Sequence, residues 1–337
     1  MYEEDLSPRC LPGTRVDELS EILRWATSPN SETIFWLSGQ WEMGKSTISR
    51  SVAYELDGSG HLGASLFFTD DVEAKTAPIT SFFTTIAVQM AIKKPGLAPY
   101  IKEAIDAEPT VAGMESKDQF DILIRSPLRR FLSDSQLKLF HRHSPHSFEE
   151  DTKVQRPMII ILNAVEACQF FQDGRAKDWI NLFTSDETVR HVLRVFITGW
   201  PDPLCSVGGA YPGISLHEIA KDVIQGDFTL FFDHELTTIR KSSDLIDAPD
   251  GPERLPPNWP GPSKIDQLVK MAIPFFGVAA SICRFIKSGP PNVMLQAVLA
   301  IDTPSKLRQS NHELTVIHSR IRQAETRRRS LHGVWDS

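Results

Sequence analysis

The chain has 337 residues, of which 41% are hydrophobic and 23% are charged, and its formal net charge is −7. This balance is typical of a globular protein, and the negative charge argues against nucleic acid or anionic lipid as a partner. No apolar run reaches the roughly 20 residues that a membrane-spanning helix needs, so we expect no membrane partner. Four scattered cysteines without a paired motif argue against a zinc site or a disulfide-stapled domain, and we expect a cytoplasmic chain with reduced thiols.

The first predicted elements alternate between helix and strand. Apolar residues at helical spacing predict a short helix over 17–26, and the compact apolar run Thr33–Ser38 predicts a buried strand. A glycine-containing turn then leads into a predicted helix over 46–56, and a second strand is predicted over 63–68. The next predicted elements are helices over 81–92, 100–107 and 119–132, the last with an irregularity at Pro127.

Two strongly apolar runs follow the polar stretch Phe140–Arg156, which we predict to be an exposed loop. The runs Met158–Leu162 and Val195–Thr198 predict buried strands, and Ile214–Ile219 predicts a weaker edge strand. Strands separated by helical stretches require parallel crossovers, so the sequence predicts a doubly wound α/β sheet. Within it we expect the Thr33–Ser38 and Met158–Leu162 strands to lie close together.

The segment Gly39–Ser46 matches the phosphate-binding pattern G-x-x-x-x-G-K-[ST] and lies between a predicted strand and a predicted helix. In this setting backbone N–H groups and the helix N-terminus bind phosphate, Lys45 reaches the β- and γ-phosphates, and the Ser46 hydroxyl holds Mg²⁺. The sequence therefore predicts a site for ATP or GTP with Mg²⁺. Its residues are Gly39, Gln40, Trp41, Glu42, Met43, Gly44, Lys45, Ser46 and Thr47.

Beyond about residue 222 the pattern becomes helical, with helices predicted over 228–239, 265–286 and 293–301 and a proline-rich connector over 249–262. We therefore predict a P-loop NTPase fold, an α/β doubly wound parallel sheet with a C-terminal helical subdomain. The predicted regions are a helical lead-in (1–30), the P-loop NTPase core (31–220), the helical subdomain (221–310) and a basic tail (311–337).

Several motifs resemble the NACHT domain of fungal NLR-like proteins, the nephrocystin-3-like N-terminal module. They are CLPGTR at 10–15, FWLSG at 35–39 leading into GKSTI at 44–48, LGASLFF at 62–68, FFTTIA at 82–87, the stretch from QF at 119–120 through PL at 127–128, NWP at 258–260 and RFI at 284–286. The resemblance implies a signalling ATPase of the STAND class, in which nucleotide state controls oligomerisation. It also implies self-association or NLR-like proteins as partners.

The chain departs from the family pattern after two strands. Where the family reads D-A-L-D-E-C, this chain reads NAVEAC at 163–168. The comparison implies that Asn163 replaces the acid that steadies Mg²⁺ through water, and that Ala167 replaces the acid that polarises the attacking water. Glu166 keeps one carboxylate. Where the family reads T-S-R-P-E, this chain reads TGWPD at 198–202, so Trp200 replaces the arginine that senses the γ-phosphate.

Within the phosphate loop, Glu42 stands where the family usually has glycine. A carboxylate close to a phosphate costs about 1 kcal/mol if solvated. Glycine also permits backbone angles that glutamate adopts reluctantly. Glu42 is therefore predicted to weaken nucleotide binding.

These losses favour a hydrolysis-deficient, nucleotide-binding switch or interaction domain. The alternatives are an active ATPase or GTPase that uses Glu166 with an arginine supplied by a partner, a scaffold that binds no nucleotide, and a small-molecule P-loop kinase. Glu166 is the remaining candidate for a catalytic residue, and Ser46 with Asn163, the latter through water, are the candidates for a metal site.

Overall fold

The computed structural model describes residues 9–68, 82–142, 157–168, 176–199, 213–219, 225–244 and 255–300. Residue contacts divide the chain into two compact units. The first consists of Met1–Cys10, Val16–Gln40 and Lys45–Ile219, and the second of Leu11–Arg15, Trp41–Gly44 and Ala220–Ser337. The tip of the phosphate loop, Trp41–Gly44, is thus grouped with the C-terminal helices.

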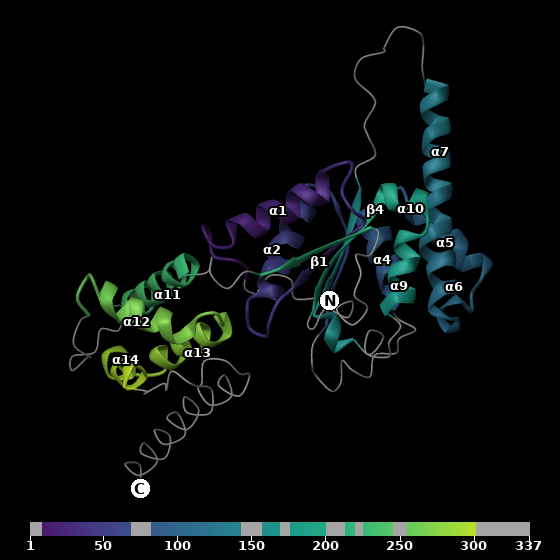
Figure 1. The fold of residues 1–337 in the computed structure, drawn as a ribbon. Coiled ribbons are helices and arrows are strands. Elements are labelled where there is room, and N and C mark those ends of the chain that lie inside the picture. The colour runs from purple at the N-terminus through teal and green to yellow at the C-terminus, as the bar shows by residue number, and fades with distance from the viewer. Residues whose placement is uncertain are drawn as a thin grey trace. The chain divides into compact units, whose positions relative to one another are not determined.

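The first unit is built on a five-stranded sheet with the strand order β2-β3-β4-β1-β5. Its strands β1 and β4 are labelled in Figure 1. Every pairing is parallel, which confirms the predicted doubly wound sheet. The strands β1 and β3 each pair with β4, so one strand separates the two that we expected to lie close together. The strands are β1 (Ile34–Ser38), β2 (Leu62–Phe67), β3 (Met158–Asn163), β4 (Leu193–Gly199) and the edge strand β5 (Ile214–Glu218).

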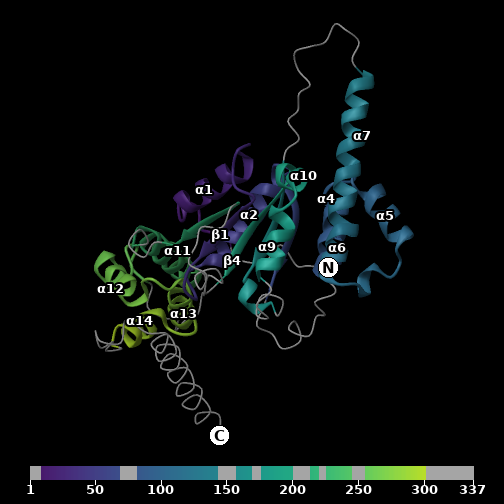
Figure 2. The ribbon, with the colours of Figure 1, turned by 45° about the vertical axis from the view of Figure 1, so that its right-hand side comes forward.

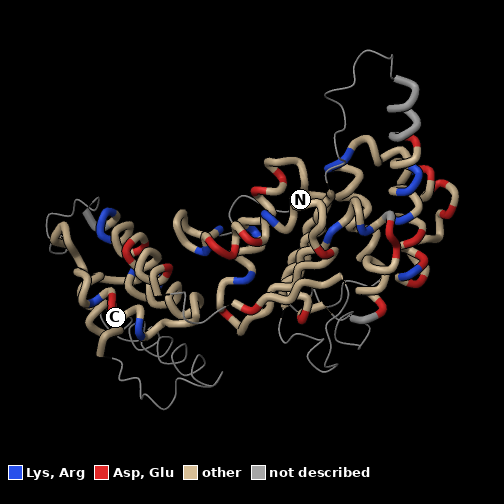
Figure 3. Tube along the Cα trace, turned by 45° about the horizontal axis from the view of Figure 1, so that its top comes forward, with Lys and Arg blue, Asp and Glu red and all other residues tan. Residues whose placement is uncertain are grey.

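Helices cover both faces of this sheet (Figures 1 and 2). Trp36 and Ile160 belong to the core on one face, whereas the ring of Phe35 packs against Trp25 on the other. Because both faces are buried, the strands carry almost no charge, and Lys, Arg, Asp and Glu lie mainly on the helices (Figure 3). One face is covered by α1 (Val16–Thr27) and α2 (Lys45–Gly58), and the other by α4 (Phe82–Lys93), α9 (Ala176–Thr184) and α10 (Glu187–Val192).

Outside α4 lies a further helical layer, in which the irregularity predicted at Pro127 falls slightly earlier in the chain. The Ser126 N–H bonds to the carbonyl of Asp121, five residues back, and so forms a π-helical turn. Pro127 has no N–H and its ring crowds the carbonyl of Leu123, so a widened turn before it relieves the clash. The elements are α5 (Ala98–Ala107), α6 (Ser116–Phe120), the π-helix Asp121–Arg125 and α7 (Ser126–Arg142).

The helix α7 continues through Arg142, so the predicted loop over Phe140–Arg156 was wrong for its first three residues. The rest of that loop, residues 143–156, lies outside the described residues, as do Trp200 and the basic tail 311–337. Among the helices that the structure describes, none combines the length and apolar character that crossing a membrane requires.

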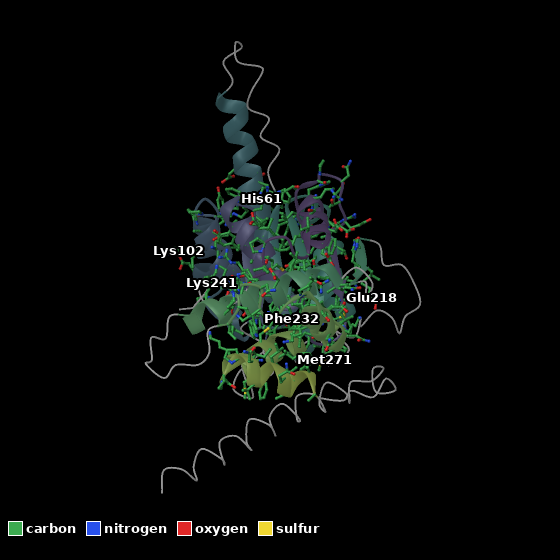
Figure 4. All side chains as sticks on the ribbon, turned by 90° about the vertical axis from the view of Figure 1, so that its left-hand side faces the viewer. His61, Lys102, Glu218, Phe232, Lys241 and Met271 are labelled. Atoms are coloured by element: carbon green, nitrogen blue, oxygen red, sulfur yellow. The ribbon has the colours of Figure 1, made fainter. Side chains whose placement is uncertain are left out.

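The second unit contains a small bundle of four C-terminal helices. The prediction of one helix over 265–286 was wrong, because Pro274 interrupts the pattern and separates α12 from α13. Aromatic and aliphatic side chains fill the bundle, among them the fully buried Phe228 and Phe232 of α11 (Figure 4). The helices are α11 (Gln225–Asp244), α12 (Pro262–Ala272), α13 (Phe276–Lys287) and α14 (Pro291–Leu299).

Candidate nucleotide site

The segment Gly39–Ser46 leaves the end of β1 and enters the first turn of α2, the strand-to-helix setting predicted from the sequence. Gly44 has a φ of 88°, a conformation that residues with a Cβ rarely adopt. A Cβ on Gly39 would lie 3.4 Å from Cδ1 of Ile219, so this glycine also permits close packing. The first turn of α2 supplies the unpaired N–H groups and partial positive charge that favour an anion.

Lys45 begins α2, and its side chain turns back onto the loop. The side chain is buried, with 8% of the residue exposed, and Nζ donates hydrogen bonds to the carbonyls of Gly39 at 2.6 Å and Gln40 at 2.9 Å. Burial lowers the pKa of the Lys45 ammonium, and the Glu166 carboxylate acts in the opposite direction. The loop therefore encloses a cation that is bonded to neutral carbonyls.

The two residues predicted to hold a metal meet at the end of β3. Nδ2 of Asn163 donates a hydrogen bond to Oγ of Ser46 at 3.0 Å. Oδ1 of Asn163 accepts a hydrogen bond from the Thr198 hydroxyl at 2.9 Å, and this hydroxyl oxygen accepts from the Ala164 N–H at 3.2 Å. Sequence reasoning placed Asn163 here but missed Thr198, whose polar side chain at the end of a neighbouring apolar strand was the available signal.

Glu166 lies in a 3-10 turn, Val165–Ala167, directly after β3. It interacts electrostatically with Lys45, so the candidate catalytic carboxylate is close to the phosphate loop. A Cβ on Gly199 would lie 2.8 Å from Cγ2 of Val165 and 3.1 Å from Oε2 of Glu166, so glycine at this position makes room for the turn. Ala167 is buried and offers only a methyl group.

The tip of the loop belongs to the second unit, where Arg15 holds it. The Arg15 guanidinium donates a hydrogen bond from Nη2 to the Met43 carbonyl at 2.8 Å and lies 5.1 Å from the centre of the Phe276 ring. The Arg15 backbone N–H donates a hydrogen bond to Oδ2 of Asp227 at 3.1 Å. The side-chain Nε of Arg15 lies 3.7 Å from the same Asp227 oxygen. The sequence motif at 10–15 contains Arg15, but nothing in the local pattern assigns it to this contact.

Glu42 has a φ of 62°, in the left-handed region, as expected for a position that usually holds glycine. Its carbonyl accepts a hydrogen bond from the Gly277 N–H at 3.3 Å. Its side chain covers Gly277 so closely that a Cβ there would lie 2.5 Å from Cδ and Oε2 of Glu42. The Glu42 carboxylate thus lies at the first turn of α13, where the helix N-terminus favours negative charge.

The remaining predicted loop residues differ in exposure. Trp41 is 52% exposed, and Thr47 is partly buried with its carbonyl accepting a hydrogen bond from the Ser51 hydroxyl at 3.0 Å. Trp200, predicted to replace an arginine near the γ-phosphate, lies outside the described residues. The described part of the predicted site is therefore one continuous loop together with the turn after β3.

Residues 13–140 match the family model of the nephrocystin 3 N-terminal domain. The match includes the phosphate loop, ends before β3 and covers less than half of the chain. No curated protein matches the sequence.

Solved structures show a more extensive likeness in fold. A Walker-type ATPase, PABY2304 of Pyrococcus abyssi, is similar with a TM-score of 0.50 and 13% identity over 96% of this chain and 80% of that chain. Together with the parallel sheet and the loop between β1 and α2, this similarity shows the α/β fold of P-loop NTPases. The structure of Drosophila ORC bound to DNA is similar with a TM-score of 0.42 and 14% identity over 94% of this chain and 65% of that chain. The structure of C. elegans PCH-2 is similar with a TM-score of 0.39 and 11% identity over 83% of this chain and 66% of that chain.

Proposed function

We propose that this chain is a NACHT-type signalling module that binds ATP or GTP and does not hydrolyse it. As in the STAND proteins that it resembles, the bound nucleotide would control self-association or contact with NLR-like partner proteins. The similarity of residues 13–140 to the nephrocystin 3 N-terminal domain and the P-loop NTPase fold support this proposal. The observation that carries it is the buried Lys45 within the loop at the start of α2.

The lysine explains why a phosphate would be preferred at this loop. Nζ of Lys45 is bonded to two neutral carbonyls, of Gly39 and Gln40, at the cost of partial desolvation. An ammonium is attracted more strongly to the negatively charged oxygens of a phosphate than to neutral carbonyl oxygens. A phosphate that replaces these carbonyls would therefore pair with the buried Lys45 ammonium and accept hydrogen bonds from the N–H groups at the α2 N-terminus.

The turn after β3 supports binding without turnover. Hydrolysis needs a carboxylate or an equivalent group to orient the attacking water, and Ala167 places a methyl group at the position where the resembling family has this acid. Asn163 brings an amide to the position of the other acid. Both substitutions remove negative charge at the end of β3, and Trp200 would remove a positive charge after β4.

One observation favours the alternative of an active NTPase. Glu166 keeps a carboxylate in the turn after β3, and this carboxylate interacts with Lys45. The negative charge of this carboxylate favours the protonated form of Lys45. Nucleotide turnover separates this alternative from our proposal, whereas nucleotide binding separates both from a scaffold.

The test of binding compares four proteins by isothermal titration with ATP, ADP and GTP in the presence of EDTA. Lys45→Ala removes the cation, and we expect it to weaken binding by about 100-fold or more, beyond detection. Lys45→Met keeps the buried aliphatic stem and should fold like the parent chain while also failing to bind.

The matched control is Lys102→Ala, which removes a cation that is 75% exposed on α5 and paired with Asp106 (Figure 4). It should bind like the parent chain. A parent chain that binds no nucleotide, or a Lys45→Met variant that binds as tightly as Lys102→Ala, would contradict the proposed function and favour the scaffold.

A further inference from the structure

The Asn163 amide lies between two hydroxyl groups, those of Thr198 and Ser46. Thr198 is fully buried, and its hydroxyl oxygen already accepts a hydrogen bond from the Ala164 N–H. The hydroxyl proton is then available for Asn163, and in the structure it is donated to Oδ1 of Asn163 at 2.9 Å. The carbonyl oxygen of the amide therefore faces Thr198, and its NH₂ group faces the opposite direction.

That NH₂ group meets the residue that would bind magnesium. Nδ2 of Asn163 lies 3.0 Å from Oγ of Ser46 and can only donate, so the Ser46 oxygen uses a lone pair to accept this hydrogen bond. In a phosphate loop that binds Mg²⁺, the same oxygen gives a lone pair to the metal. A carboxylate at position 163 would accept a hydrogen bond from the Ser46 hydroxyl and leave the lone pairs of the Ser46 oxygen to Mg²⁺. The Asn163 amide instead directs hydrogens with partial positive charge toward that oxygen.

The described residues around Ser46 and Asn163 offer few other ligands for Mg²⁺. Mg²⁺ prefers carboxylate and other oxygen ligands in octahedral geometry. At nucleotide sites Mg²⁺ takes phosphate oxygens and waters together with one or two protein carboxylates, and the described turn after β3, Val165–Ala167, contains one, Glu166. The nearby carboxylate of Glu166 already interacts with Lys45. The residues present therefore do not fit Mg²⁺.

We propose that the site binds its nucleotide in the metal-free form and discriminates against the Mg²⁺ complex, with Asn163 as the discriminating residue and Thr198 as the residue that positions it. This inference rests on the proposed function. Lys45 and the N-terminus of α2 would balance the phosphate charge, and the NH₂ group of Asn163 adds a donor to the same region.

The experiment is isothermal titration of the full chain with ATP, once with EDTA and once with excess Mg²⁺. Excess Mg²⁺ converts most ATP into its complex, so we expect the apparent affinity to fall by about threefold or more. Affinity that is equal or tighter with Mg²⁺ overturns this inference and leaves the proposed function intact. Absence of binding under both conditions overturns the proposed function itself.

Two variants test whether the amide is the cause. Asn163→Asp replaces the donor with a carboxylate and should reverse the preference, so that Mg²⁺ strengthens binding. Thr198→Val removes the hydroxyl that fixes the amide and should reduce the discrimination, whereas Thr198→Ser keeps the hydroxyl and should preserve it. If Asn163→Asp keeps the preference of the parent chain for metal-free ATP, the assignment to Asn163 is wrong.

Discussion

Glu42 combines an unfavourable backbone with a favourable side-chain position. Its φ of 62° brings Cβ close to the following carbonyl oxygen, which costs roughly 1–2 kcal/mol for residues other than glycine. Its carboxylate lies at the first turn of α13, where the helix N-terminus stabilises a negative charge by roughly 0.3–1 kcal/mol. The contact has room only because residue 277 is glycine, so Glu42 and Gly277 depend on each other.

A double-mutant cycle tests this dependence. Gly277→Ala should destabilise the parent chain by roughly 1–3 kcal/mol, because the new Cβ would overlap the Glu42 side chain. In the Glu42→Gly background the same substitution should be neutral or stabilising, because alanine is the better helix former. The measurement is the free energy of unfolding in urea for the four proteins.

Gly226 provides the matched control for this cycle. It occupies the same position in the first turn of α11 as Gly277 does in α13, and a Cβ there would meet nothing within 4 Å. Gly226→Ala should therefore be tolerated in both backgrounds. Equal effects of Gly277→Ala with and without Glu42 would show that the two residues are not coupled.

Residues of the candidate site differ in how well the sequence predicts them. Lys45, Ser46 and Asn163 follow from a local pattern, because a phosphate loop and a strand end fix their neighbours. Thr198 and Gly277 do not, because their roles depend on contacts between segments that are far apart in the chain. Such contacts leave no periodic signal in either segment.

At the scale of elements, Arg194 joins α1 to the sheet. This residue of β4 is buried, and its guanidinium donates to four carbonyls at and beyond the end of α1: those of Trp25 (2.6 Å), Ala26 (2.9 Å), Ser28 (2.5 Å) and Pro29 (3.2 Å). The last carbonyls of a helix have no partner within the helix. Arg194 therefore caps α1 from a strand, which explains a charged residue inside an otherwise apolar run.

Replacing this cap should destabilise the first unit. Arg194→Met keeps much of the volume but removes every donor, and we expect a loss of roughly 2–4 kcal/mol because buried carbonyls lose their partners. Arg24→Met, on the exposed face of α1, is the matched control and should change stability by less than about 0.5 kcal/mol. Urea denaturation gives both values, and similar losses for the two variants would contradict the capping role.

The sequence predicted the strands better than the helices. Each apolar run became a strand within a residue or two, because strands buried on both faces are apolar without interruption. Two prolines have different effects on the helices. Pro127 follows a widened turn and the helix continues, whereas Pro274 separates α12 from α13. The apolar pattern around each proline did not indicate which of the two would end a helix.

At the scale of the whole molecule, strand order was the main feature that the sequence did not provide. The apolar runs predicted parallel strands, but nothing in them indicates that β4 lies between β1 and β3. This order matters for the site, because it places Thr198 of β4 beside Asn163 of β3. The division into two units was also not predicted in detail, since Leu11–Arg15 and Trp41–Gly44 belong with the C-terminal helices.

Under the proposed function, the module retains the phosphate loop and does not hydrolyse the bound nucleotide. If the losses at Asn163, Ala167 and Trp200 act together, restoring all three should recover more turnover than any single reversion, because parts that act as a unit are not additive. The comparison uses Asn163→Asp, Ala167→Glu and Trp200→Arg, singly and combined, with phosphate release as the measurement. A single reversion that equals the triple variant would contradict this reading.

The most direct test of the central claim is the fate of bound ATP in the unmodified chain. The protein is incubated with radiolabelled ATP and Mg²⁺, and bound nucleotide and released phosphate are separated by chromatography, with Lys45→Ala as the control. Under the proposed function, Ala167 and Asn163 stand where carboxylates would orient water and hold Mg²⁺, so we expect that bound nucleotide stays triphosphate and that phosphate release does not exceed the control. Phosphate release that Lys45→Ala abolishes would contradict the proposed function and favour the alternative of an active NTPase.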